Sequence, residues 1–559
     1  MENKDNFLYE VSNESQEPLN TCIGQQWIYS NDNNNNNYSS NQISLDLTSF
    51  YNANSLIDWR TAYIQIPLVS VVDIVGAGAN EFNPNIYSLK NGYANLINSM
   101  QVECSNTTVN QVSNNINFYT NFKVFTSKSK DWFNTAGPSL GFYGLDDHNT
   151  WSFGNVYNNR GYGSCNNTAN ISQGTPIDSG NTNGNLSLFN RVRSIINPST
   201  IGDTAGNGTT SLISLGSLNQ MGGDYIDDNA AHTKRIYYHN AIIRLGDIAD
   251  FFDKLNLSRC YVRLLINLNV GTWDMDTLTA GVLTSSSNIN STFSYNTCPF
   301  NINAKDSSNL LAAVTRIRAT IGVCKAAGID GTVINHTLTA TRVYASQMTL
   351  APEKEKLYRM NNAQKLLVWD DVFSTSLLNQ PGNNNAVNYV VSNGISRLKG
   401  ILTVPFISGT SNAGSLVIAG GSNKIAPNLT PFGSEPSTTS PLMSLYNFNI
   451  FCAGKALMPS NLNYNFNTFN DQFIGVNSIN GGGMVSGDLC SGSIDYNKWF
   501  NNYRYYYLEA SRHDEADISP KSISVQFTNN NLVNCDYYFF IIFERHALLD
   551  VVSGQLQMI

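Results

Sequence analysis

Residues 501–515, NNYRYYYLEASRHDE, form the densest group of chemically capable side chains in this sequence. They include four tyrosines, two arginines, one histidine, one aspartate and two glutamates, in a chain with only 13% charged residues. Such side chains could serve as acid and base in a catalytic pocket, contact the phosphates of a nucleic acid, or pack into a wall.

The order of the residues favours the wall. Side chains of an extended strand alternate between two faces. The alternation predicts two sets, with Tyr503, Tyr505 and Tyr507 on one face and Arg504, Tyr506 and Leu508 on the other. A catalytic site rarely needs three tyrosines along one strand face. Packed tyrosines, in contrast, bury a large area and keep a polar tip for a partner.

Two arginines of this segment are candidates for ion pairs with nearby acidic residues. We expect Arg504 and Arg512 to pair with Glu509, Asp514 or Glu515, in the same or a neighbouring subunit. The alternative is an ordinary exposed ion pair, which would contribute little. The residues predicted to serve structure and assembly are Arg504, Tyr505, Tyr507, Arg512, Glu544 and Arg545.

Motifs for cofactor, phosphate or metal binding are incomplete. Gly409 and Gly414 have the spacing of a phosphate-binding loop, but Ser415 stands where that loop needs lysine. The stretch VGAGANE (75–81) lacks the third glycine of a dinucleotide loop, and DMDT (274–277) lacks the glycine and glutamate of a calcium loop. We therefore expect no cofactor and no metal.

The six histidines are scattered along the chain. Asp146-Asp147-His148 could contribute to a metal site or a triad, but alone it is more typical of a solvated loop. The same holds for Tyr237-Tyr238-His239, which fits one edge of a strand. With no catalytic constellation, the chain is not expected to be an enzyme.

The composition indicates a large β protein with long loops. Among 559 residues there are 28 tyrosines and 27 phenylalanines, and aromatic and β-branched residues suit a half-buried pleated surface. The net charge is −8, and residues 1–60 contain only two basic side chains, Lys4 and Arg60. Strong direct binding of nucleic acid is therefore not expected, because it needs a basic patch or arm.

The nine cysteines include no CxxC pair. We expect reduced thiols in an intracellular protein, packed as small hydrophobic residues. No apolar run approaches the length of a membrane-spanning helix, and the start MENKDNFLYE is not a signal peptide.

Hydrophobic patterns predict several elements. Residues 56–75 show period two through Ala62, Ile64, Ile66 and Leu68, and Pro67 suggests an edge or a bulge. Residues 96–112 read as a hairpin with SNTT as its turn. Residues 248–255 fit a short amphipathic helix, and 261–270 a strand. The run CDYYFFIIFE (535–544) lacks clean alternation, so it should be a strand covered on both faces.

The last third of the chain resembles a known family. PFGSEPSTTSPLMSLYNFNIFCAGKAL (431–457), SGSIDYNKWFNNYRYYYLEASR (491–512) and the closing segment 522–556 with "FER … DVVSGQ" are similar to the major capsid proteins of polinton-like viruses and the virophage-related lineage. Residues 244–270 resemble the end of the first jelly roll in that family, and 341–358 the start of the second.

The resemblance implies an all-β double jelly roll, with two tandem eight-stranded sandwiches standing upright, long loops and a few short helices. It further implies homotrimers that tile an icosahedral shell around a double-stranded DNA genome. The partners would be copies of the chain itself, a separate penton protein, and minor capsid or cement proteins. The location would be the virion capsid.

The expected division follows from these patterns: 1–45 a flexible N-terminal arm, 46–300 the first jelly roll, 301–335 a connecting segment and 336–559 the second jelly roll. Two alternatives remain open. One is a single jelly-roll capsid protein of a small single-stranded DNA virus, although many of those carry a basic arm. The other is a carbohydrate-binding β protein, which exposed aromatics with paired acids would favour.

Overall fold

The computed structural model describes a defined part of the chain. The described residues are 22–34, 38, 41–51, 55–76, 86–145, 187, 191, 224–226, 234–255, 257–276, 289–291, 297–303, 314–323, 340–361, 363–408, 444–472, 493–501, 503–510, 519–531 and 534–559. Asp146-Asp147-His148, Gly409, Gly414 and Arg512 lie outside them.

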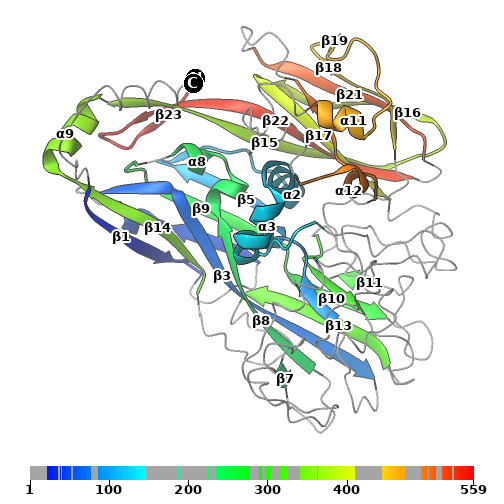
Figure 1. Ribbon diagram of the computed structural model, residues 1–559, viewed down its shortest axis with the longest axis horizontal. Coiled ribbons are helices and arrows are strands. Elements are labelled where there is room, and N and C mark those ends of the chain that lie inside the picture. The colour runs from blue at the N-terminus through cyan, green and yellow to red at the C-terminus, as the bar shows by residue number, and fades with distance from the viewer. Residues whose placement is uncertain are drawn as a thin grey trace.

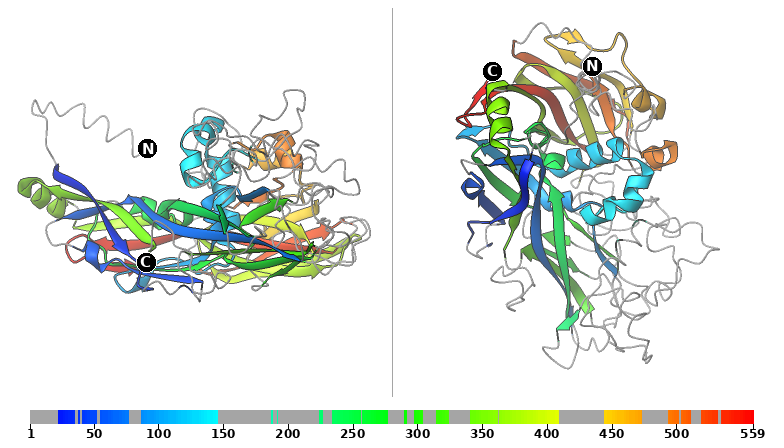
Figure 2. Two further views of the ribbon diagram at one scale, coloured as in Figure 1. Left: turned by 90° about the horizontal axis from the view of Figure 1, so that it is seen from below. Right: turned by 60° about the vertical axis from the view of Figure 1, so that its left-hand side comes forward.

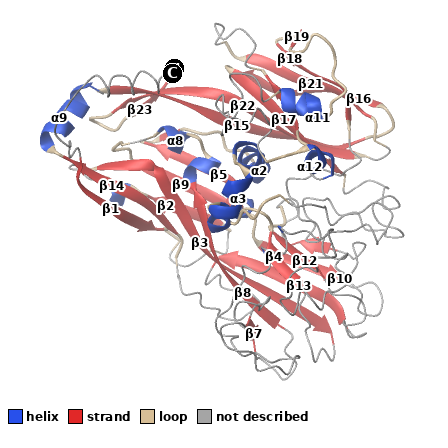
Figure 3. Ribbon diagram, viewed as in Figure 1, coloured by secondary structure: helices blue, strands red, loops and turns tan. Residues whose placement is uncertain are grey.

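Strands dominate the described chain (Figures 1 and 3). The earlier ones are β1 (Cys22–Asn31), β2 (Gln42–Asp46), β3 (Leu56–Gly76), β4 (Ile86–Leu89), β5 (Ile97–Cys104), β6 (Thr107–Thr108), β7 (Asp224–Ile226), β8 (Lys234–Arg244), β9 (Val262–Leu268), β10 (Gly271–Asp276), β11 (Ile289–Ser291), β12 (Phe300–Asn303), β13 (Val314–Val323) and β14 (Arg342–Leu350). The later ones are β15 (Gln364–Gln380), β16 (Asn385–Ile395), β17 (Leu398–Ile407), β18 (Leu445–Cys452), β19 (Lys455–Ala456), β20 (Tyr506–Glu509), β21 (Lys521–Asn529), β22 (Cys535–Asp550) and β23 (Leu556–Met558).

The helices are short. They are α2 (Ile116–Ser127), α3 (Lys130–Thr135), α7 (Leu245–Ile248), α8 (Phe251–Lys254), α9 (Pro352–Asn361), α11 (Phe466–Asp471) and α12 (Tyr496–Asn501), with the 3-10 turns η1 (Thr48–Phe50), η2 (Tyr93–Leu96) and η3 (Gly137–Leu140).

The later strands form a complete jelly roll. Its two sheets have the orders β15-β22-β17-β20 and β16-β21-β18-β19. If β15 to β22 are numbered one to eight, these orders become 1-8-3-6 and 2-7-4-5, the strand order of a jelly roll. Phe527 of one sheet packs on Tyr537 of the other, with ring centroids 4.6 Å apart.

The earlier strands repeat part of this order. β9 lies between β2 and β5, and β8 pairs with β3. With β2, β3, β5, β8 and β9 as first, second, third, seventh and eighth strands, these are the 1-8-3 and 2-7 pairings of the same fold. The prediction of an all-β chain with two jelly-roll sandwiches and a few short helices is therefore confirmed.

Strand β3 organises the first sandwich. Ala62, Ile64, Ile66 and Leu68 are fully buried, as their period predicts. β3 is a central strand rather than an edge, since β8 pairs along one side of it. On the other side, pairing with β14 ends at Gln65 and pairing with β13 begins at Leu68. Pro67 thus has a strand partner on one side only, which suits a residue without an N–H.

Two predicted local elements differ in detail. The hairpin at 96–112 forms as β5 and β6. Its turn is shorter than the predicted SNTT, because Thr107 and Thr108 belong to β6. The two remaining turn residues, Ser105 and Asn106, have φ of 51° and 64°. The single helix predicted at 248–255 is two separate turns, α7 and α8. Ala249 between them is extended, with φ −129° and ψ 112°. The apolar side chains of the segment are nevertheless buried.

Several segments join sheets that the predicted division does not anticipate. β1 and β2 lie almost wholly within the predicted arm 1–45, yet β1 pairs with β14 and β2 with β9. The described part of that segment is therefore not a free arm, because Ile43 and Leu45 are buried in the core. β13, within 301–335, and β14, within 336–559, both pair with β3 of the first sandwich. The boundaries of the two units stay a prediction.

Candidate functional site at the contact between the two sandwiches

Helix α2 lies between the two sandwiches (Figure 1). Phe118, Phe122 and Phe125 have the spacing i, i+4 and i+7, which places them on one side of the helix. That side packs on the outer face of the sheet containing β17, β20 and β22. The ring centroids are 5.3 Å apart for Phe118–Phe406, 5.4 Å for Phe118–Tyr538, 5.1 Å for Phe122–Tyr505, 5.6 Å for Phe122–Tyr507 and 5.2 Å for Phe125–Tyr503.

The tyrosine run has the alternation predicted from the sequence. Tyr505 and Tyr507 face α2, whereas Tyr506 points the other way, 5.0 Å from the ring of Tyr464 and 6.0 Å from that of Trp499. All three tyrosines are fully buried. The segment is a packed wall inside the subunit, and its further role in assembly stays a prediction.

The same contact covers β22 on both faces. Tyr538 packs on Phe118 of α2, while its neighbours Tyr537 and Phe539 point toward Phe527 in the opposite sheet. This confirms the expectation for the run CDYYFFIIFE. It also shows why that run lacks alternation, because both faces of the strand are interior.

Arg504 lies against aromatic rings. Its Nε donates a hydrogen bond to the carbonyl of Phe500 at 3.0 Å. Its guanidinium lies 4.7 Å from the ring centroid of Phe500 and 5.7 Å from that of Trp499, within the range of a cation–π contact. Burial lowers the pKa of Arg504, and Tyr506 opposes that effect. Arg512 and two of its proposed partners, Asp514 and Glu515, lie outside the described residues.

A buried carboxylate joins the second sandwich to the segment that leads into α2. Asp371 of β15 accepts the backbone N–H of Gln111 at 2.8 Å and Nε of Arg545 at 2.7 Å. Arg545 also donates to Oε1 of Gln111 at 3.3 Å. Burial raises the pKa of Asp371 to about 6, although Arg545 and two backbone N–H groups favour the charged form.

A second charged network lies beside the first. Lys399 Nζ is 2.7 Å from Oδ1 of Asp370 and 3.9 Å from Oε2 of Glu544. Glu544 in turn contacts His546 at 2.5 Å. Burial raises the pKa of Asp370, while Lys399 lowers it. Cross-strand pairing sets this arrangement, since Asp370 lies opposite Glu544 in the register of β15 and β22.

The structure thus divides the predicted residues into two groups. Arg504, Tyr505 and Tyr507 lie around α2 and α12, and Glu544 and Arg545 lie in the charged networks. The sequence reasoning missed α2 itself and both carboxylates of β15. Signals for both exist: three phenylalanines at helical spacing, and two acids inside the apolar run VWDDVF (368–373).

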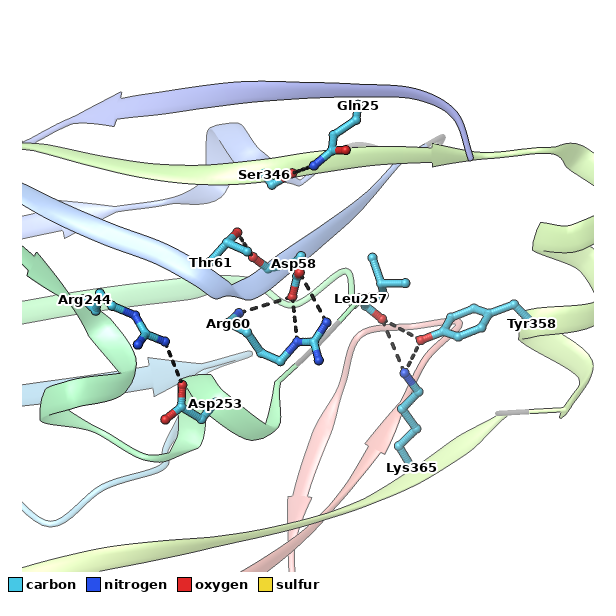
Figure 4. Close-up of polar contacts among 10 residues, drawn as sticks. All are labelled: Gln25, Asp58, Arg60, Thr61, Arg244, Asp253, Leu257, Ser346, Tyr358 and Lys365. Carbon is cyan, nitrogen blue, oxygen red and sulfur yellow. Dashed lines mark hydrogen bonds and ion pairs between the residues drawn. The ribbon is translucent and has the colours of Figure 1, made fainter. Parts of the chain in front are cut away.

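Further hydrogen bonds cross the contact. Ser113 Oγ donates to the carbonyl of Val372 at 2.5 Å and accepts the N–H of Ser374 at 3.1 Å. At the far end, the Tyr358 hydroxyl donates to the carbonyl of Leu257 at 2.8 Å, where Nζ of Lys365 also lies (Figure 4). The two sandwiches therefore share one buried apolar cluster, and hydrogen bonds join them at several separate places.

A small cavity remains between α2, α8 and β15. Tyr119, Asp250 and Asp371 are among the side chains that line it, and its volume of about 20 Å³ suits one water molecule. The Tyr119 hydroxyl is buried and has no hydrogen-bond partner among the described residues. Burial raises the pKa of Tyr119 well above its usual value, and the Asp250 and Asp370 carboxylates add to this.

The charged side chains at the contact are paired with one another. Three carboxylates at the contact have a close cationic partner: Lys123 for Asp250, Lys399 for Asp370 and Arg545 for Asp371. In the part of the chain that the structure describes, no three His, Cys, Asp or Glu side chains lie close enough to hold a metal ion. Over the same residues, no helix is long and apolar enough to cross a membrane.

Comparison with known proteins gives structural neighbours only. No family model and no curated protein matches the chain. The chain is similar to a chain in the cryo-EM structure of the Sputnik virophage, with 11% identity and a TM-score of 0.49 over 98% of this chain and 92% of that one.

Two capsid proteins are similar in the same way. The mavirus major capsid protein has 10% identity and a TM-score of 0.41, over 99% of this chain and 94% of that one. The Faustovirus major capsid protein has 10% identity and a TM-score of 0.42, over 96% of this chain and 92% of that one. All three alignments span both sandwiches.

Proposed function

We propose that this chain is a structural major capsid protein. Three copies form a pseudo-hexagonal homotrimer of six upright jelly rolls, and these trimers tile an icosahedral shell around a double-stranded DNA genome. The protein is not an enzyme. It resides in the virion capsid, and its other partners are a penton protein and minor capsid or cement proteins.

The repeated strand order carries this proposal. The second sandwich has the full jelly-roll order, and the first has the pairings 1-8-3 and 2-7 of the same order. Three copies of such a chain supply six similar units, and six similar units around a three-fold axis give a nearly hexagonal outline. Helix α2 packs between the two sandwiches of each chain, so each subunit brings two joined units to the capsomer.

The charge balance supports the same role. A net charge of −8 does not favour direct coating of nucleic acid. Buried interfaces between subunits disfavour unpaired charge, and the chain is poor in charge. The residues predicted for assembly keep that role as a proposal. Arg512→Ala is expected to weaken trimer or shell formation. Unchanged assembly would contradict a role of Arg512 in these contacts.

The test is the solution and particle state of the full chain. Light scattering after size exclusion should give three times the chain mass, and cryo-EM class averages of that species should have a near-hexagonal outline. A stable monomer would contradict the proposal. If that monomer binds glycans, the carbohydrate-binding alternative is supported. The single jelly-roll alternative is already contradicted, because the strand order of a jelly roll occurs twice in this chain.

A further inference from the structure

Strand β1 forms one border of the largest sheet. The sheet order begins β1-β14-β3, so β14 pairs with one side of β1. Figures 1 and 2 show β1 at the margin of the molecule. On its other side, no strand among the described residues pairs with β1 between Cys22 and Asn31.

This edge lacks the features that usually prevent strands from associating. The sequence CIGQQWIYSN contains no charged residue and no proline. After an irregularity at Cys22/Gly24, the register with β14 is unbroken from Gly24 to Asn31. Natural edge strands are typically short, charged, bulged or interrupted by proline, because a regular edge is a template for another strand.

Four other edge strands of the described sheets are protected. β11 and β20 are short, spanning Ile289–Ser291 and Tyr506–Glu509. β15 carries Lys365, Asp370 and Asp371. β16 is also uncharged, but its register is broken at Val390/Ser392 and again at Ser392/Ile395. Among these edges, β1 alone is long, uncharged and regular.

An aromatic row runs along the outer face beside this edge. Trp27 lies 5.9 Å from Tyr63, Tyr63 stacks on Tyr344 at 5.0 Å, and Tyr344 lies 5.7 Å from Tyr29. Trp27 and Tyr29 are 56% and 55% exposed. Gln25 bonds Ser346 of β14 at 2.9 Å, which fixes β1 against its neighbour (Figure 4).

We propose that β1 pairs antiparallel with β1 of a second copy of this chain and so joins two capsomers. The outward edge of β1 has no strand partner among the described residues, and such an extended edge matches another extended strand. A second copy supplies one that is equally uncharged, so pairing brings no charged side chains of β1 together. In this pairing, Trp27 and Tyr29 of each copy lie beside those of the other copy, so the aromatic row continues from one subunit to the next. Cross-strand aromatic pairs of this kind stabilise sheets.

Symmetry places this contact. Two identical strands in antiparallel pairing are related by a two-fold axis, which makes the contact isologous. A two-fold axis does not occur inside a three-fold trimer, so the contact lies between trimers. The inference rests on the proposed function and adds to it the surface through which capsomers meet.

The test uses the full-length chain in two states, isolated trimers and assembled particles. Hydrogen exchange of the peptide covering residues 22–31 should slow by at least about tenfold on assembly, because new backbone hydrogen bonds protect the outward amides. Contact through side chains alone would leave these amides fast, which would overturn strand pairing.

A substitution provides the second measurement. Trp27→Lys places a charge in each copy beside the two-fold axis, where like charges oppose one another. Trimers should form as in the wild type, and particle yield should fall by at least about tenfold, as expected for a charged edge. The matched control is Val390→Lys, on the broken edge of β16 with 51% exposure, and it should assemble normally.

The outcomes separate this inference from the proposed function. Normal assembly of Trp27→Lys, or an equal loss in Val390→Lys, would overturn the β1 contact and leave the trimer proposal intact. Loss of the trimer itself in Trp27→Lys, or slow exchange of 22–31 already in isolated trimers, would place β1 inside the capsomer and also overturn it. Failure of the wild type to form trimers would instead contradict the proposed function.

Deletion of residues 1–45 is a poorer test, because it removes nearly all of β2 with β1.

Discussion

Nε of Arg545 lies 2.7 Å from Oδ2 of Asp371, and the same carboxylate accepts the backbone N–H of Gln111. Strand β22, its neighbour β15 and the segment before α2 therefore meet at one carboxylate. The Asp371 side chain is only 6% exposed. Its protonation state thus affects the contact between the two sandwiches.

The first prediction concerns the pH dependence of stability. The pKa of Asp371 is raised from 3.8 to about 6 in the folded chain. A raised pKa stabilises the folded state fully below the unfolded value, and this contribution is lost as pH rises through about 6. With about 1.4 kcal/mol per pKa unit, the loss between pH 4 and pH 7 is up to about 3 kcal/mol.

Asp371→Asn removes this contribution because asparagine does not titrate. The free energy of unfolding of the variant minus that of the wild type should therefore rise between pH 4 and pH 7, as measured by urea denaturation at several pH values. Asp550→Asn is the control. The pKa of Asp550 is lowered by the N–H groups of Ser553 and Val552, so its difference should stay flat between pH 5 and pH 7. A flat difference for Asp371→Asn would contradict the prediction.

The second prediction concerns the partner cation. Arg545→Met leaves Asp371 buried without its guanidinium, which should cost about 1–3 kcal/mol of unfolding free energy at pH 7.5. The cost should shrink at pH 5, where the Asp371 carboxyl is largely protonated. The same denaturation series at both pH values checks this. An equal cost at both would show that Arg545 acts by packing alone.

The third prediction concerns the aromatic side of α2. Phe122 packs against Tyr505 and Tyr507 and is fully buried. Phe122→Ala should lower the unfolding free energy by about 3–5 kcal/mol, because it removes a ring and leaves a cavity. Phe122→Leu should cost clearly less.

Phe500→Ala is the matched control, since the Phe500 ring is 47% exposed. It should cost less than either substitution at Phe122. Denaturation followed by tryptophan fluorescence measures all three variants. A small effect of Phe122→Ala would mean that α2 is not the link between the sandwiches.

The fourth prediction concerns a close approach of backbone and ring. A Cβ at Gly400 of β17 would lie 2.6 Å from Cε2 of Tyr507. Gly400→Ala should therefore displace the Tyr507 ring from its place beside α2 and cost about 1–3 kcal/mol of unfolding free energy. Gly394→Ala on β16 meets nothing within 4 Å and should be neutral. Equal melting temperatures for the two variants would contradict this prediction.

The local patterns of the sequence determined the strands and their faces. Period two predicted the buried side of β3, and the order of the tyrosine run predicted which rings face opposite ways. The unpatterned run in β22 predicted a strand with two covered faces. These features follow from the geometry of a single strand and from the transfer of apolar side chains out of water, so a short window of sequence contains them.

Only the tertiary structure decided which strands pair and what covers them. Gln25 of β1 bonds Ser346 of β14, 321 positions away. Neither segment contains a pattern that identifies the other as its partner. The pairing is made by backbone hydrogen bonds, and these depend little on which side chains the strands carry. For this reason the sequence predicted a flexible arm over 1–45, where the structure has β1, and gave no sign that β14 pairs with β3.

The same limit applies to the contact between the sandwiches. The carboxylate of Asp371 meets Gln111 and Arg545 only because β15 pairs with β22 and α2 docks on their sheet. Its pKa depends on burial, and burial is a property of the assembled elements. The sequence therefore determined the type of the elements, and the long-range packing of those elements determined which charges lie together and which strand borders each described sheet.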